Sequence, residues 1–117
     1  MTVELDVFSG RPNPAWKLSP AESAKLAEML KDIPPSQMVG AEGGLGYRGF
    51  VLSNPERAAG LPTRIRIYND MIIVDEESSP RSYRDTHGVE RALLRQASER
   101  GYGEILKALL PAENQPF

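Results

Sequence analysis

The stretch TRIRIYNDMIIV, residues 63–74, decides the fold. Polar and apolar side chains alternate strictly over residues 63–68, which is the period of a half-buried β-strand. Asn69 and Asp70 then supply turn residues, and residues 71–74 run apolar on both faces. The stretch therefore predicts a β-hairpin whose second strand is the more buried.

The apolar second strand of this hairpin carries a further expectation. Because residues 71–74 are apolar on both sides, both faces of the sheet are expected to be covered. The face that the helices do not cover would be covered by a loop, by the C-terminal tail or by another copy of the chain. The last alternative predicts a homodimer and, for the whole chain, a self-associating structural protein.

Further strands and helices are indicated on either side of the hairpin. Val3, Leu5 and Val7 alternate with polar residues and predict the first strand. A capping signal at residues 19–22 starts a helix that ends before Pro34 and Pro35, while residues 75–85 are polar, contain Pro80 and are expected to form a loop. Two helices follow, the first with Val89, Leu93 and Ala97 inward and Glu90 outward.

These elements predict an α+β fold. It is a two-layer sandwich, in which a mainly antiparallel three- or four-stranded sheet carries helices on one face. The predicted strands are residues 2–8, 47–52, 63–68 and 71–74. The chain, residues 1–117, is expected to form a single domain.

Composition excludes several classes of function. Fourteen Lys and Arg stand against sixteen Asp and Glu, a formal charge of -2, so no global basic field disposes the chain to bind nucleic acid. The absence of Cys excludes disulfides, thiolate zinc sites and cysteine nucleophiles. The sequence has no apolar run of about 18 residues, and acids stand at Glu4 and Asp6 where a signal peptide needs hydrocarbon. A cytoplasmic protein without a membrane span or a cofactor is predicted.

The segment FSGRPNP, residues 8–14, is the first candidate for recognition. Two prolines and Gly10 predict a rigid loop that presents Arg11, whose guanidinium suits a carboxylate or phosphate. Asn13 is expected to be extended because Pro14 follows it. The alternative is that Arg11 pairs with an acid of its own domain. Trp16 is expected to anchor the edge of the core.

A second candidate is a cationic shelf on the sheet. Arg64, Arg66 and Tyr68 point to one side of their strand, and Arg48 lies on a neighbouring strand. Together they would hold an anionic ligand or an acidic peptide. The alternative is a solvated face on which the arginines pair with Glu4 or Asp6.

The glycine-rich residues 41–49 precede this strand. They lack the pattern of a phosphate-binding loop and serve as a flap over a pocket or as turns. Gly49 predicts a bulge or a close backbone approach.

The sequence offers few candidate residues for metal binding or catalysis. Residues 75–77 are acidic, and Asp85 lies near His87, yet no metal-binding pattern is present and helix capping is the favoured role. His87 is the single histidine, so no metal is predicted. A small cofactor-free hydrolase, isomerase or lyase would use carboxylates, tyrosines or His87 as acid and base. Convergence of Asp6, Arg11, Tyr47 and His87 on one cavity would favour that alternative.

The leading hypothesis is a small non-enzymatic binding or accessory module. It recognises a protein partner or a small anionic ligand, because rigid loops with arginines and aromatic residues are the parts that recognition uses. The predicted binding residues are Arg11, Asn13, Trp16, Tyr47, Arg48, Arg64, Arg66 and Tyr68.

Overall fold

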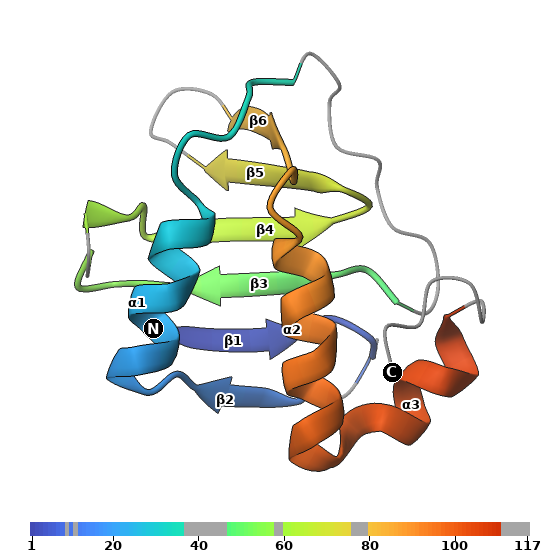
Figure 1. The fold of residues 1–117 in the computed structure, drawn as a ribbon. Coiled ribbons are helices and arrows are strands. Elements are labelled where there is room, and N and C mark those ends of the chain that lie inside the picture. The colour runs from blue at the N-terminus through green and yellow to red at the C-terminus, as the bar shows by residue number, and fades with distance from the viewer. Residues whose placement is uncertain (9, 11, 37–46, 58–59, 76–79, 111–117) are drawn as a thin grey trace.

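Among the residues whose placement is described, six strands form a sheet that is antiparallel at every pair and makes up one layer of the protein. The computed structural model describes residues 1–8, 10, 12–36, 47–57, 60–75 and 80–110. The strands lie in the spatial order β2-β1-β3-β4-β5-β6 (Figure 1). Their bounds are β1 Thr2–Leu5, β2 Ala15–Lys17, β3 Phe50–Ser53, β4 Arg64–Tyr68, β5 Met71–Asp75 and β6 Pro80–Arg84.

The hairpin predicted over residues 63–74 is confirmed. β4 and β5 pair from Ile65 opposite Val74 to Tyr68 opposite Met71. The two residues between them, Asn69 and Asp70, have φ of 53° and 61°, the left-handed conformation that a two-residue hairpin turn requires. This register fixes which side chains of the two strands share a face.

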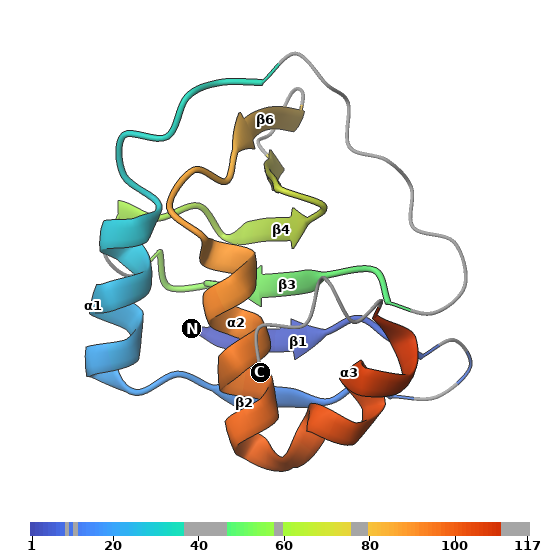
Figure 2. The same cartoon turned by 45° about the vertical axis from the view of Figure 1, so that its right-hand side comes forward.

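Two helices lie on the same side of this sheet. α1 (Pro20–Met29) and α2 (Val89–Ala97) both pack over what we call the inner face, and the opposite side is the outer face (Figures 1 and 2). A π-helical segment, Ser98–Tyr102, continues α2 into α3 (Gly103–Leu109), and Gly101 breaks the helical path with a φ of 96°. The helical layer is therefore carried by residues from both ends of the chain.

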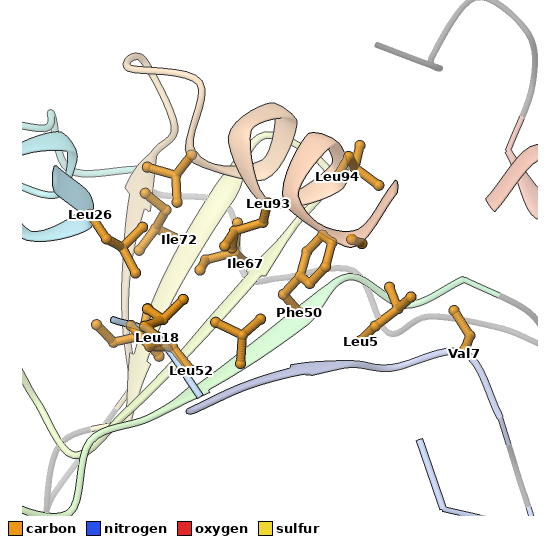
Figure 3. Close-up of a cluster of buried hydrophobic side chains, with 14 of the residues drawn as sticks. Leu5, Val7, Leu18, Leu26, Phe50, Leu52, Ile67, Ile72, Leu93 and Leu94 are labelled. Carbon is orange, nitrogen blue, oxygen red and sulfur yellow. The ribbon is translucent and has the colours of Figure 1, made fainter. Parts of the chain in front are cut away.

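The hydrophobic core fills the space between the inner face and the helices (Figure 3). Every second residue of the central strands points into this core, and leucines and small apolar residues of the helices pack against them. Among the core side chains that are 5% exposed or less are Val3, Leu5, Leu26, Phe50, Leu52, Ile65, Ile67, Ile72, Val89, Leu93, Leu94 and Leu106. The predicted α+β class with an antiparallel sheet is confirmed.

The predicted strand number of three or four is wrong, because two edge strands join the sheet. β2 has three residues and pairs with β1, and β6 pairs along the whole of β5. β6 was expected to be loop because its sequence is polar and contains Pro80. An edge strand is held by main-chain bonds, and a proline at its first residue is tolerated there.

The free edge of β6 is partly occupied by the segment that follows α1. The Ser36 amide donates to the Ser82 carbonyl at 2.8 Å, and the Arg84 amide donates to the Pro34 carbonyl at 2.8 Å. An isolated bridge joins Pro35 to Tyr83. The segment therefore shields this edge from pairing with another strand.

On the outer face, the described residues place no helix (Figures 1 and 2). Met71 is buried there and Ile73 is half-buried. Cover by a second copy of the chain stays a prediction. Within the described part of the chain, no helix has the length and apolar character needed to cross a bilayer.

Candidate functional site

Basic side chains gather on the outer face. Arg64 and Arg66 point there because Ile65 and Ile67, between and beyond them on β4, are buried in the core. The strand register places Lys17 of β2 and Arg84 of β6 on the same face. Arg48 and Asp6, just outside the strands, join this face through their contact with each other. Of the charged side chains on this face whose placement is described, five are basic, Lys17, Arg48, Arg64, Arg66 and Arg84, and two are acidic, Glu4 and Asp6; the side chain of Asp75, at the end of β5, lies outside the described ones.

Asp6 is the centre of this cluster. Arg48 donates to its Oδ1 from Nη2 at 2.8 Å and from Nε at 3.2 Å, and Arg66 Nη1 donates to its Oδ2 at 3.2 Å. The Asp6 side chain is 13% exposed. Burial alone would raise its pKa, but hydrogen bonds from the two arginines and their positive charges outweigh burial, so the pKa lies below its ordinary value of 3.8. Pairing with Asp6, one of the two alternatives for the arginines of this face, is therefore observed for Arg48 and Arg66.

Asn13 ties the loop after β1 to the same cluster. Its Oδ1 accepts from the amides of Val7 at 3.0 Å and Phe8 at 2.7 Å. Its Nδ2 donates to Glu4 at 2.9 Å and to Asp6 at 3.2 Å. All four hydrogen-bonding positions of the amide are used, so Asn13 orders the loop and two carboxylates at once.

Gly49 makes the close backbone approach that the sequence predicts. Its φ is 85°, and a Cβ at this position would lie 2.2 Å from the carbonyl oxygen of Ile67 and 2.6 Å from Cβ of Tyr68. The Asp6 amide donates to the Gly49 carbonyl, and the Arg48 amide donates to the Asp6 carbonyl. The glycine therefore sets Arg48 beside Asp6.

Tyr47 belongs to a second polar centre through its hydroxyl. Its hydroxyl donates to Glu90 Oε2 at 2.5 Å, and its ring makes edge contacts with Phe50 and Tyr68. The other Glu90 oxygen, Oε1, accepts from the Asp70 amide at 3.1 Å. Glu90 was expected to point outward, but it is half-buried where the start of α2 meets the hairpin turn.

The pKa of Glu90 moves in the opposite direction to that of Asp6. Burial raises it above its ordinary value of 4.5, and the charges of Asp70 and Asp85 raise it further, while the hydrogen bond from Tyr47 lowers it in part. Burial and the Glu90 charge also raise the pKa of the Tyr47 hydroxyl. The Tyr47 hydroxyl accordingly stays protonated near neutral pH and remains the donor of this hydrogen bond.

Trp16 and His87 have structural partners elsewhere. Trp16 points to the inner face, where its Nε1 donates to Gln96 at 2.6 Å and its ring stacks on Tyr102. His87 Nδ1 lies 2.8 Å from the Met29 carbonyl, which joins the entry of α2 to the end of α1. Neither residue reaches the arginine cluster.

Asp85 uses both oxygens as a helix cap. They accept from the amides of Val89 at 2.7 Å and Glu90 at 2.8 Å. Among the described residues, no group of three or more His, Cys, Asp or Glu is placed to hold a metal ion. The Asp85 and His87 pair is therefore accounted for by capping and by the contact with α1.

The structure brings together Asn13, Arg48, Arg64, Arg66 and Tyr68 of the predicted binding residues on or beside the outer face. Arg11 lies outside the described residues, as do residues 41–46 of the glycine-rich segment and Glu76 and Glu77. The residues proposed for acid and base chemistry have separate partners, so the described structure does not converge them on one cavity.

Sequence reasoning missed Glu90 and Gln96, because their partners Tyr47 and Trp16 are 43 and 80 positions away along the chain. Comparison of the chain with known protein families, curated proteins and solved structures finds no match. The geometry of the outer face therefore carries the functional argument.

Proposed function

We propose that the protein is a non-enzymatic binding module that docks an acidic segment of a protein partner on its outer face. The observation that carries the proposal is the excess of basic over acidic described side chains there, five against two, in a chain with a formal charge of -2. Such a local field attracts and orients an acidic partner.

The Asp6 cluster prepares two of the arginines for binding. Arg48 and Arg66 are held by the same carboxylate, with exposed side-chain fractions of 24% and 35%. A guanidinium has five N–H donors, and the contacts to Asp6 and to the Phe8 carbonyl occupy only some of them. Because the arginines are already ordered, a partner carboxylate binds them at a smaller entropic cost.

The spread of the basic groups favours a peptide or protein surface over a small anion. They run from Lys17 on β2 at one edge to Arg84 on β6 at the other. Six strands at roughly 4.8 Å spacing span about 24 Å, the length of an extended peptide of about seven residues. A single phosphate or carboxylate would contact only a fraction of this surface.

The test measures binding of a fluorescein-labelled decaglutamate peptide by fluorescence anisotropy at 20 and 200 mM NaCl. Native protein should bind, and the higher salt should weaken the affinity severalfold. Lys17→Glu combined with Arg84→Glu should weaken binding about tenfold or more at 20 mM NaCl, because two attractions become repulsions.

The matched control reverses the same number of charges on the helical side, at the exposed Arg91 and Arg95 of α2. This variant should bind within about twofold of native. Equal weakening by both double variants would show that net charge, not the outer face, attracts the peptide, and would overturn the proposal. Failure of native protein to bind at either salt would overturn it as well.

A further inference from the structure

A cavity of about 250 Å³ opens on the inner side of the sheet, away from the outer face. Its floor is formed by Ile65 of β4 and by Ile72 and Val74 of β5. Leu30 and Ile33, from the end of α1 and the residues after it, form a wall. After α1 the chain continues as coil toward β6 and does not cover this part of the sheet with a helix (Figure 1).

The lining combines an apolar body with a negatively charged rim. Leu61 and Pro62 complete the apolar wall, and Tyr83 and Asp32 are the polar residues that line the cavity. An apolar pocket with few polar groups is the usual form of a small-molecule site. The volume lies just below the roughly 300–1,000 Å³ of drug-sized sites, so it suits a molecule of about ten non-hydrogen atoms.

Asp32 contributes a negative charge beside the end of α1. Its φ is 54°, the left-handed region that glycine adopts most readily. It also follows the C-terminal end of α1, where the helix dipole repels a negative charge. The helix end and the carboxylate therefore combine in a local negative potential at this side of the cavity.

No group in the described structure neutralises that charge. The Asp32 carboxylate has no hydrogen bond or ion pair there, and the neighbouring Lys31 pairs instead with Glu28 at 3.0 Å. The negative end of α1 adds to its field, although His87 already occupies the Met29 carbonyl. The rim of this apolar cavity is therefore suited to a positive charge.

We propose that this cavity binds a small organic cation, an ammonium group carried on an apolar body. The ammonium lies at Asp32 and the end of α1, and the hydrocarbon lies against Ile65, Ile72 and Val74. The ring of Tyr83 supplies an electron-rich face beside the ammonium. This inference does not depend on the outer face, because the two sites lie on opposite sides of the sheet.

The test compares three probes of similar shape, namely 2-phenylethylamine, 2-phenylethanol and phenylacetate, by ¹H–¹⁵N NMR titration. Native protein should bind the amine about tenfold more tightly than the alcohol, and phenylacetate most weakly. Asp32→Asn should abolish the preference for the amine and leave the affinity for the alcohol unchanged, because Asn tolerates the same backbone conformation. The shifted resonances should include Ile33, Ile72 and Tyr83.

Two further variants keep the result interpretable. Glu99→Gln removes an exposed charge outside the cavity lining and should retain the tenfold preference. Ile33→Phe fills the cavity and should weaken the amine and the alcohol alike, with thermal melting confirming that it folds. Equal affinity of native protein for amine and alcohol, or no binding of the amine, would overturn the proposal, whatever the outcome for decaglutamate.

Discussion

Asp6 and Glu90 are two partly buried carboxyl groups whose pKa values move in opposite directions. Asp6 meets two guanidinium groups, and its pKa falls despite burial. Glu90 meets a tyrosine hydroxyl and a main-chain amide, with Asp70 and Asp85 nearby, and its pKa rises. Burial acts in the same sense at both, so the charge of the neighbours decides the direction. One centre holds two ordered arginines, and the other joins a helix to a hairpin.

Gly49→Ala should have the largest effect, because this glycine directly follows Tyr47 of one centre and Arg48 of the other in the chain. The added Cβ would meet the Ile67 carbonyl oxygen at 2.2 Å, so the variant should lose about 3–5 kcal/mol of unfolding free energy in urea. Gly101→Ala is the control, with a φ of 96° but no atom within 4 Å of the new Cβ, and should lose about 1–2 kcal/mol. Similar losses would show that backbone strain, not the close approach, is the constraint.

Asp6→Asn should come next, with a loss of about 1–3 kcal/mol. The variant keeps the shape of the side chain but leaves Arg48 and Arg66 partly buried without a counter-charge. Urea unfolding at pH 7 measures the loss. Glu99→Gln removes an exposed acid and should change the free energy by less than about 0.5 kcal/mol. An Asp6→Asn loss no larger than this control would contradict the central role given to Asp6.

Tyr47→Phe should cost less, about 0.5–1.5 kcal/mol, because it removes one hydrogen bond to Glu90. The matched control is Tyr68→Phe, since the Tyr68 hydroxyl has no hydrogen bond in the described structure. The difference between the two variants should disappear when each is combined with Glu90→Ala. If the difference persists, the Tyr47 hydroxyl acts through another group.

The smallest expected effect is a difference in the pH dependence of the melting temperature. Asp6 has a lowered folded pKa, so its stabilising contribution is present above 3.8 and is lost as pH falls through the folded pKa. Glu90 has a raised folded pKa, so its contribution is full below 4.5 and is lost as pH rises through the folded pKa.

Melting curves between pH 2.5 and 7 should therefore separate the two centres. Asp6→Asn should differ most from native at pH 6–7 and approach it in acid. Glu90→Gln should gain stability relative to native as pH rises above 4.5. If the melting temperatures of the two variants changed in parallel with pH, the opposite pKa shifts of Asp6 and Glu90 would be contradicted.

The hairpin could be predicted from the sequence because its first strand alternates, its second strand is continuously apolar, and its turn residues tolerate positive φ. The same alternation placed Arg64 and Arg66 together, and pairing with Asp6 was one of two alternatives for that face. β6 could not be read, because an edge strand needs main-chain partners and little side-chain pattern. Its place depends on β5 and on the segment after α1.

The second polar centre was hidden for a different reason. Helical periodicity gave Glu90 an outward position, yet Tyr47 and the hairpin turn cover it from elsewhere in the chain. Trp16 was expected at the edge of the core and among the binding residues, and its contacts with Gln96 and Tyr102 place it on the inner side. Tertiary contacts of this kind leave no local signal.

The four hydrogen bonds of Asn13 have a consequence for the chemical ageing of the protein. Loss of the amide nitrogen would place a third carboxylate against Glu4 and Asp6, where Asn13 now donates to both. Spontaneous deamidation proceeds through attack by the main-chain N–H of the next residue on the side-chain amide. The next residue is Pro14, which has no N–H. The asparagine that orders this end of the molecule is thus followed by the residue that preserves it.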